Sequence, residues 1–241
     1  MTPWYPAAIR KVGNSGGSYT GGPFKGVLHT TEGSSAAGAI GAYAANNSWP
    51  HFTVDRDGKV YQHVGIDVAA RALRNESGGV QTNRDSAIQV EVVGWASKPA
   101  WPLVQVEALR KLMRWVEAQT GIQPTGPVFG SGEQYGYRNP LEFSPSTWDA
   151  FNGWCGHQHV PENSHWDPGA IDLKTLLPEV MIPMIPVNAP AVALWVSPTG
   201  LGYIVLCADG GVFAFGDAPV LAALGRVDYR LPAGNDWTPA A

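Results

Sequence analysis

Residues 156–169 read Gly156-His157-Gln158-His159-Val160-Pro161-Glu162-Asn163-Ser164-His165-Trp166-Asp167-Pro168-Gly169, and they hold three of the chain's six histidines. Imidazole and carboxylate groups suit a borderline divalent metal such as zinc, and catalytic zinc sites combine three protein ligands with water. A loop from His157 to Asp167 could fold both ends onto one ion, although a polar surface loop would have the same composition. The stretch therefore indicates a possible metal site, for which the rest of the chain must supply a third ligand and a base.

A histidine at the end of a predicted strand is the first candidate for that third ligand. Residues 25–31 form a short apolar run that contains His29, and Ser34 or Ser35 then provides an N-cap for a small-residue helix over 36–45. A strand that turns into a helix in this way places its imidazole at the rim of a sheet, where sites are usually built. Taken alone, His29 is more often a structural residue than a ligand.

Two alternating segments around the turn Asp55-Arg56-Asp57-Gly58 predict a β-hairpin over residues 51–64. His51 starts the first strand, where it could lie near the site. His63 alternates outward on this pattern, so we expect no role for it.

The next predicted strand, residues 87–94, carries a carboxylate among β-branched neighbours. Its alternation places Gln89 and Glu91 on one face of the sheet and Ile88, Val90 and Val92 on the other. Glu91 is then either a solvated sheet residue or a buried acid–base group. The pattern alone favours the solvated interpretation.

The remaining segments give a coarse outline of the chain. An apolar stripe predicts a helix over 103–119 that ends at Gly121, and Ser144-Pro145 predicts the start of a short helix. Cys155 is expected to be a buried small residue and not a ligand. We also expect a last helix over 170–177 and irregular chain over residues 1–23, 71–85 and 121–143.

The composition excludes several classes of function. The net charge is −4, so the composition does not indicate a nucleic acid or an anionic membrane as a partner. Cys155 and Cys207 form neither a disulfide framework nor a Cys-x-x-Cys zinc knuckle. Prolines interrupt the apolar residues 176–196, which indicates a linker and no membrane span. The N-terminus lacks the pattern of a signal peptide, so we expect a soluble protein made in the cytoplasm.

Four of these segments resemble, in their order, the type-2 N-acetylmuramoyl-L-alanine amidases, a zinc amidase family that includes the peptidoglycan recognition proteins. The segments are Gly26-Val27-Leu28-His29-Thr30-Thr31, the hairpin residues 51–62, Ile88-Gln89-Val90-Glu91-Val92-Val93-Gly94, and Gly156-His157 with Asp167-Pro168-Gly169. Each is weak alone, but their combination is highly specific and spans roughly residues 25–177. The Gly-His-Gln-His-Val-Pro form resembles most closely the endolysins from phages of actinobacteria. The resemblance implies an α/β fold in which α-helices flank a central mixed β-sheet, with zinc at one rim.

The resemblance also implies a role for each site residue. The family's zinc ligands fall on His29, His157 and Asp167, and its catalytic glutamate falls on Glu91. His165 stands where the family often has a lysine that contacts the substrate oxygen, so we expect it to be catalytic.

Two features depart from the family or go beyond its motifs. A Trp-His pair that is common after the hairpin is missing, since the chain reads Ala70-Arg71-Ala72-Leu73 there, and part of the usual substrate rim therefore differs. His159 is not assigned to the metal, so it is expected to support the site or to contact substrate.

The implied reaction is hydrolysis of the amide between N-acetylmuramic acid and L-alanine in bacterial peptidoglycan. Zinc would lower the pKa of a bound water toward ~7, and Glu91 would take its proton and pass it to the leaving amine. Zinc and His165 would stabilise the oxyanion. An endolysin of this kind is made in the host cytoplasm and released to act on the cell wall.

Two alternatives remain beside the amidase. A non-catalytic peptidoglycan-binding module would bind wall fragments without cutting them, although the carboxylate third ligand favours a working enzyme. A zinc peptidase would use His157 and His159 together with an upstream His-x6-Asp motif. Here His51 lies six positions before Asp57, which is one residue short of that motif.

The C-terminal part is predicted to be separate. The chain divides into a catalytic domain (1–180), a Pro-rich linker (181–192) and a β-rich segment (193–241) that resembles one unit of a repeat. A single unit cannot bury its own apolar face. We therefore expect it to dock on the catalytic domain or on another copy of the protein, with wall binding as a role by analogy.

Overall fold

The computed structural model describes residues 3–131, 140–177, 190–197, 203–215, 229–230 and 238–239. The chain separates into two compact units, Met1–Glu179 and Val180–Ala241, which are described here one at a time. Residues 181–189 of the predicted linker lie outside the described residues, as do Tyr135 and Tyr137 of the predicted long loop.

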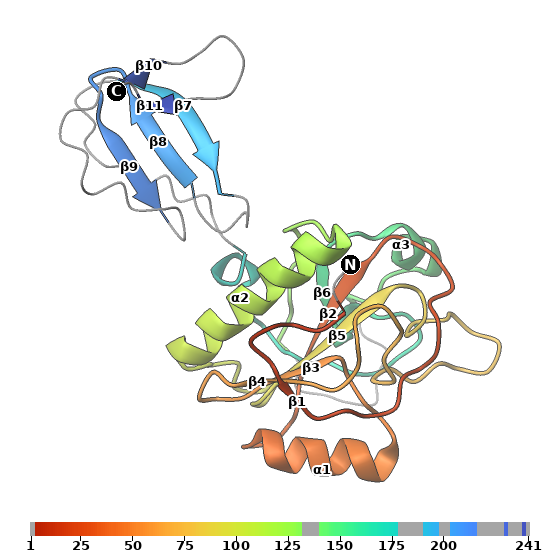
Figure 1. Ribbon diagram of the computed structural model, residues 1–241. Helices are drawn as coiled ribbons and strands as arrows, with labels where there is room; N and C mark the ends of the chain where they lie inside the picture. The colour runs from red at the N-terminus through yellow and green to blue at the C-terminus, as the bar shows by residue number, and fades with distance from the viewer. Residues whose placement is uncertain are drawn as a thin grey trace. The chain divides into compact units, whose positions relative to one another are not determined.

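A six-stranded mixed sheet forms the centre of the first unit (Figure 1). Among its strands, β3 and β4 are antiparallel because they form the predicted hairpin, and all other neighbours run parallel. The predicted α/β fold with a central mixed sheet is confirmed. In spatial order the strands are β1 (Ile9–Arg10), β4 (Val60–Gln62), β3 (Phe52–Val54), β5 (Ala87–Val92), β2 (Lys25–Thr30) and β6 (Trp154–Gly156).

Three helices begin and end close to the predicted residues. They are α1 (Ala36–Asn46), α2 (Leu103–Thr120) and α3 (Pro145–Ala150). The Ser35 side chain caps α1 by accepting a hydrogen bond from a backbone N–H, and Ser144 caps α3 in the same way. Helix α2 ends at Gly121, which adopts the left-handed conformation (φ 77°) that favours glycine.

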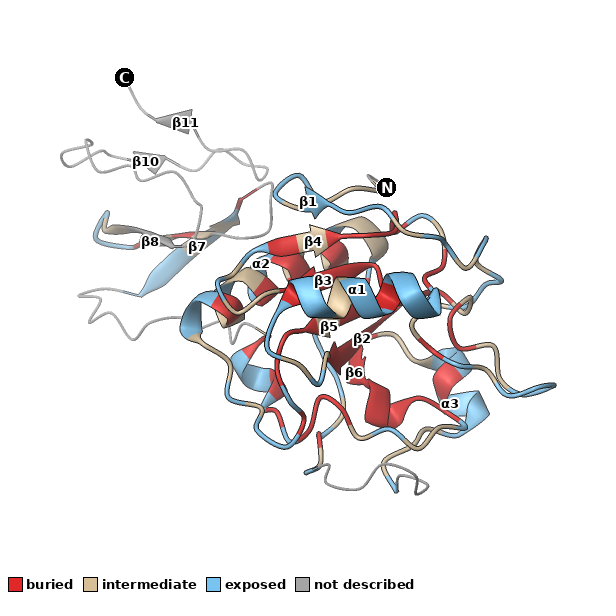
Figure 2. Cartoon of the chain, turned by 90° about the horizontal axis from the view of Figure 1, so that it is seen from below, coloured by how far each residue is buried: buried red, intermediate tan, exposed pale blue. Residues whose placement is uncertain are grey.

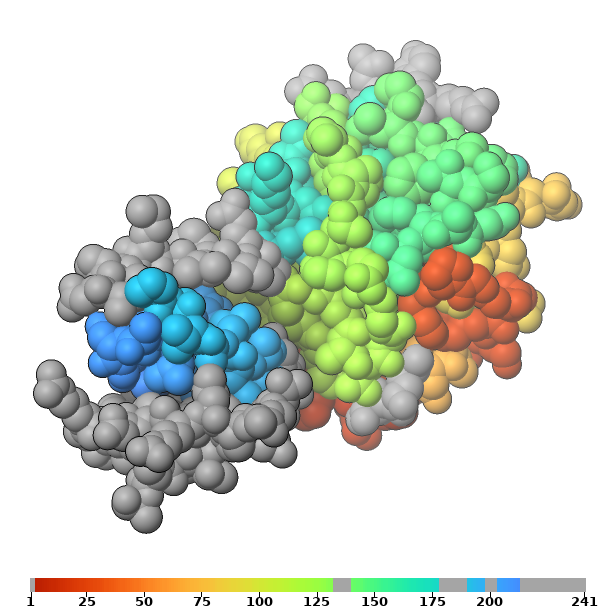
Figure 3. All heavy atoms as spheres, turned by 90° about the horizontal axis from the view of Figure 1, so that it is seen from above, coloured from red at the N-terminus to blue at the C-terminus, as the bar shows by residue number. Residues whose placement is uncertain are grey.

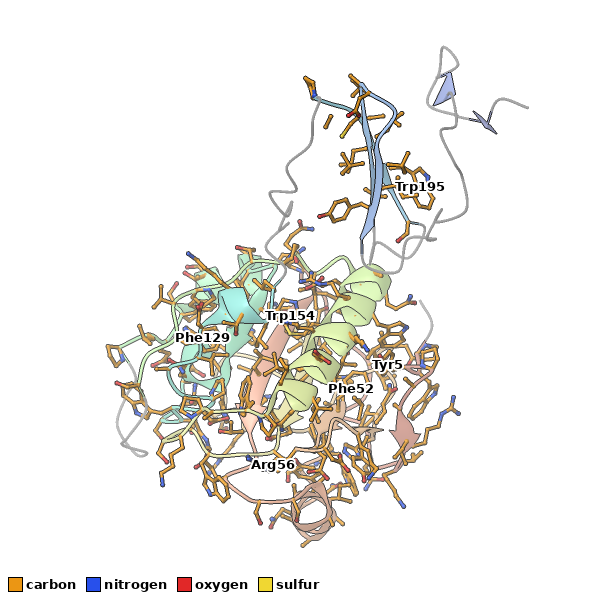
Figure 4. All side chains as sticks on the ribbon, turned by 90° about the vertical axis from the view of Figure 1, so that its left-hand side faces the viewer. Tyr5, Phe52, Arg56, Phe129, Trp154 and Trp195 are labelled. Carbon is orange, nitrogen blue, oxygen red and sulfur yellow. The ribbon has the colours of Figure 1, made fainter. Side chains whose placement is uncertain are left out.

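The two faces of the sheet have different surroundings. Alternate residues of β5 (Ile88, Val90 and Val92) are fully buried and belong to one hydrophobic cluster with the apolar stripe of α2. Each such buried side chain contributes roughly 1.5–3 kcal/mol. Figure 4 shows Tyr5 and Phe52 close to α2, where both rings contact Trp115. The outer side of α2 forms a ridge on the surface (Figure 3).

Helix α1 lies over the opposite face, with its own outer side exposed (Figure 2). Its Tyr43 is buried there, and its ring centroid is 5.7 Å from that of His63. Because side chains alternate along a strand, this is the face to which Gln89 and Glu91 belong. The site residues therefore lie on the side of the sheet away from α2.

Three expectations from the sequence are wrong. Residues 1–23 are not wholly irregular, because β1 pairs in parallel with β4. His63 does not face solvent: residues 11–13 cover it, and its Nδ1 lies 2.8 Å from the Lys11 carbonyl oxygen. Residues 170–177 form one short 3-10 turn, η2 (Leu173–Thr175), in place of a helix. Leu177 precedes a proline, which disfavours the helical conformation.

The second unit is β-rich, as predicted. Strands β7 (Ala191–Val196), β8 (Tyr203–Cys207) and β9 (Val212–Phe215) form an antiparallel sheet, and β10 (Tyr229–Arg230) pairs with β11 (Thr238–Pro239). On β7, Val192, Leu194 and Val196 are exposed apolar residues. The expectation that this unit docks on a partner surface stays a prediction. None of the helices that the structure describes is both long and apolar enough to cross a bilayer.

Candidate active site

Three predicted ligands meet at one edge of the sheet. His29 lies in β2, His157 begins the 3-10 turn η1 (His157–His159) that follows β6, and Asp167 comes from the loop after it. The Nδ1 atoms of His29 and His157 are 3.1 Å apart. The carboxylate of Asp167 lies 3.3 Å from His29 Nδ1 and 3.2 Å from His157 Nδ1. All three residues are buried.

These separations fit a zinc ion. Two donors that each bind zinc at ~2.0–2.1 Å in a tetrahedral arrangement lie roughly 3.3 Å apart. The two Nδ1 atoms are 3.1 Å apart, which is close to that value. Each imidazole also lies near one oxygen of the Asp167 carboxylate, His29 at 3.3 Å from Oδ2 and His157 at 3.2 Å from Oδ1. Two imidazoles and one carboxylate are also a donor set of catalytic zinc sites, which keep a fourth position open. The residues present therefore fit the metal that the sequence motifs imply.

Neighbouring groups hold His29 and Asp167 in the required orientation. The Nε2–H of His29 donates to Gln89 Oε1 at 2.7 Å, which leaves the lone pair of Nδ1 free for a metal. The backbone N–H of Thr30 donates to Asp167 Oδ2 at 3.3 Å. Sequence reasoning gave Gln89 no role. The signal was its place two residues before Glu91 on the same face of β5.

A buried amide closes the loop that carries His157 and Asp167. The backbone N–H of Gln158 donates to the Asp167 carbonyl oxygen at 3.1 Å. The side chain of Gln158 donates to the Gly169 carbonyl oxygen at 3.1 Å and accepts from the Gly130 N–H at 2.8 Å. This is how the two ends of the stretch come together, and no sequence pattern pointed to Gln158.

The three residues of the ligand cluster shift one another's pKa values. Burial lowers the pKa of His157 to about 4 although Asp167 opposes that shift. Burial also acts to lower the pKa of His29, but the hydrogen bond to Asp167 and the charges of Glu91 and Asp167 raise it to about 9. Burial would raise the pKa of Asp167, but the histidines, His157 first, hold it well below its ordinary value. In the absence of a metal, the cluster therefore retains one proton, on His29.

Glu91 lies beside the cluster and is only partly exposed, which corrects the solvated interpretation favoured by the pattern. It is the register partner of His29 on the neighbouring strand. Its Oε2 atom is buried and accepts no hydrogen bond from the described residues. Burial raises the pKa of Glu91 to about 7, and the charge of His29 opposes that shift. These are the properties of a general base that works near neutral pH.

His165 lies at the mouth of the site. Its side chain is half exposed, and its Nδ1 is 3.4 Å from Asp167 Oδ1. Its ring stacks on the ring of His157, with the centroids 4.1 Å apart. Both histidines line a cleft of about 680 Å³, so a ligand in the cleft would reach His165 and the metal position together.

Two further histidines support the backbone. His159 is buried: its Nδ1 accepts from the Gly156 N–H at 3.0 Å, and its Nε2–H donates to the Val128 carbonyl oxygen at 3.0 Å. His51 is also buried, and its Nδ1 accepts from the Gln89 N–H at 2.9 Å. The structure therefore does not bring His157 and His159 together as two ligands, the arrangement that the peptidase alternative needs.

His159→Ala is expected to keep zinc and lose stability. The substitution leaves the buried N–H of Gly156 without its partner, which costs about 1–3 kcal/mol. Thermal unfolding together with metal analysis checks this. A variant that unfolds at the wild-type temperature but lacks zinc would show instead that His159 is a ligand.

The chain resembles several solved structures at low sequence identity. A sequence comparison with curated proteins gave no match. Among solved structures, the chain is similar to a selenomethionine derivative of AmpD, with 16% identity, a TM-score of 0.49, and 73% of this chain and 96% of that one covered. It is also similar to the hydrolase AmiA of Staphylococcus aureus, with 16% identity, a TM-score of 0.49, and coverage of 71% and 82%. A third similar structure is the Ph2119 endolysin from the Thermus scotoductus bacteriophage Ph2119. It has 18% identity and a TM-score of 0.43, and the match covers 69% of this chain and 88% of that one.

A family model described as N-acetylmuramoyl-L-alanine amidase matches residues 22–170. The matched range covers more than half of the chain and includes His29, Glu91, His157, His165 and Asp167. The chain therefore belongs to the N-acetylmuramoyl-L-alanine amidase family.

Proposed function

We propose that this chain is a zinc-dependent amidase that cleaves the amide between N-acetylmuramic acid and L-alanine in bacterial peptidoglycan. The observation that carries the proposal is the meeting of His29, His157 and Asp167. The two Nδ1 atoms are 3.1 Å apart, and each lies within 3.3 Å of a carboxylate oxygen. Glu91 stands beside them, with its Oε2 atom buried. Membership of the amidase family supports the choice of substrate.

The proposed roles follow from position and charge. His29, His157 and Asp167 would hold the zinc, which would supply a Lewis acid next to the scissile carbonyl group. Glu91, whose pKa burial raises to about 7, accepts a proton from the attacking water and later donates it to the leaving amine. His165 directs an N–H group toward the oxygen on which negative charge develops. Gln89 holds His29 in one tautomer throughout.

Digestion of purified peptidoglycan tests this function. The amidase reaction releases new L-alanine amino groups and creates no new reducing sugar ends. New sugar ends, or cleaved peptide crosslinks, would show a different bond specificity. Binding to the wall with no new ends of any kind would favour the non-catalytic binding module.

His165→Ala is expected to lower kcat about tenfold or more, because removal of one donor to a developing oxyanion typically has such an effect. His165→Lys should recover most of that loss, since lysine also presents an N–H donor at the mouth of the cleft. Steady-state kinetics on both variants, each shown to be zinc-loaded, decides the point. An unchanged kcat in His165→Ala would remove this residue from catalysis.

We extend the proposal to the biological role of an endolysin, made in a host cytoplasm and released to degrade the cell wall. The form of residues 156–161, which resembles actinobacteriophage endolysins, supports this role. The full chain should then clear suspensions of actinobacterial cell walls faster than walls from other bacteria. Equal rates on all walls would count against this host range.

A further inference from the structure

Glu32 follows the end of β2 and has a left-handed backbone, with a φ angle of 47°. This conformation suits glycine but costs free energy for a residue that carries a side chain. Such a residue persists when its surroundings fix it, and residues of this kind are common at active sites. The contacts of the Glu32 side chain therefore indicate what the residue does.

The carboxylate of Glu32 ties together the ends of two neighbouring parallel strands. Its Oε1 accepts a hydrogen bond from the Thr30 hydroxyl at 2.7 Å and a second one from the Ala96 backbone N–H at 2.8 Å. Thr30 is the last residue of β2, and Ala96 lies in the segment that follows β5. Both of these partners are buried, although Glu32 as a whole is exposed.

Each partner of Glu32 also contacts the part of the chain that carries Asp167. The backbone N–H of Thr30 donates to Asp167 Oδ2 at 3.3 Å. Ala96 lies against the chain two residues further on, because a Cβ placed on Gly169 would be 2.1 Å from the Ala96 carbonyl oxygen. Glu32 therefore acts on Asp167 from two sides: through the group that binds its carboxylate, and through the segment on which its loop rests.

We propose that Glu32 is a positioning residue that holds the Asp167 carboxylate in the orientation that zinc binding requires. This inference rests on the proposed zinc-dependent function. Loss of a group that orients a metal ligand typically lowers metal affinity or activity about 10- to 100-fold, although the group does not touch the metal. Both contacts of Glu32 are hydrogen bonds to one oxygen atom, so the acceptor atom is the feature that the role needs.

Zinc competition on Glu32→Gly and Glu32→Gln tests the inference. Glycine removes both hydrogen bonds but relieves the left-handed backbone, so the metal-free variant should unfold close to the wild-type temperature. Its zinc affinity should nevertheless fall about tenfold or more. Glu32→Gln should recover most of that loss, because the amide oxygen accepts the same two hydrogen bonds.

Asn47→Ala is the matched control. Asn47 is also left-handed (φ 52°), and its side chain accepts a hydrogen bond from Asn14 at 2.9 Å, but it caps the far end of α1. This variant should lose stability and keep the wild-type zinc affinity.

Three outcomes would overturn the role of Glu32 while the amidase function stands. They are wild-type zinc affinity in Glu32→Gly, an equal loss of affinity in Glu32→Gly and Glu32→Gln, and a similar loss in Asn47→Ala. Wild-type protein that binds no zinc and cleaves no peptidoglycan would instead overturn the proposed function, and the inference with it.

Discussion

Asp167→Ala protein is expected to contain no zinc after purification and to lose essentially all amidase activity, whereas the wild type contains one zinc per chain. The carboxylate lies within 3.3 Å of both imidazoles. Its loss leaves two neutral donors and removes the negative charge that partly neutralises the positive charge of the metal. Elemental analysis and a peptidoglycan assay measure the two effects. Asp57→Ala, which removes an exposed carboxylate on the hairpin, is the matched control and should keep both zinc and activity.

The same site predicts how zinc affinity depends on pH. A histidine must lose its proton to bind a metal. The pKa of His29 is raised to about 9 and that of His157 is lowered to about 4. Between about pH 7 and 9 one proton must leave, so the apparent zinc affinity should fall about tenfold for each pH unit that the solution is made more acidic. Below about pH 7 the fall should be steeper, because zinc binding then also displaces the proton of Glu91. Zinc competition at pH 6, 7 and 8 measures this slope. Full activity in protein shown to be metal-free would end the zinc assignment altogether.

The ligand cluster could be predicted because its residues follow elements with clear local signals. The apolar run that ends near His29 reads as a strand, and β2 is found at Lys25–Thr30. Parallel strands end at one edge of a sheet, which brings the residue types at those ends together. The residues that orient the cluster carry a weaker signal. Gln89 shares a face of β5 with Glu91, but its partner His29 lies 60 positions away in the chain and the local sequence does not identify it.

Glu91 shows that the alternation of a strand predicts the face on which a side chain lies but not its exposure to water. The pattern correctly separates Glu91 from Val90 and Val92, because side-chain direction depends only on the strand. Whether that face meets water depends on the strands and helices placed around it. Strand β5 lies between β2 and β3 in the centre of the sheet, so Glu91 has neighbours on both sides. That position is a property of the topology, which the local sequence of β5 does not contain.

Glu91→Gln is expected to fold and to bind one zinc but to turn over about 10²- to 10⁴-fold more slowly. Glutamine keeps the shape of the side chain and loses its basicity. In the wild type, Oε2 accepts no hydrogen bond from the described residues, so the change breaks none there. The loss should therefore appear in kcat, with thermal stability close to that of the wild type.

The pH profile separates this loss from a general defect. Burial raises the pKa of Glu91 to about 7, and a general base works only when it is deprotonated. Wild-type kcat/KM should therefore rise with pH through an acidic limb, which the positive charge of bound zinc places below about 7. Glu91→Gln should lose that limb and show a flat residual rate over the same range. Rates are to be compared on zinc-loaded proteins at pH 5 to 8. If the variant keeps both the wild-type rate and the acidic limb, another group must carry the proton.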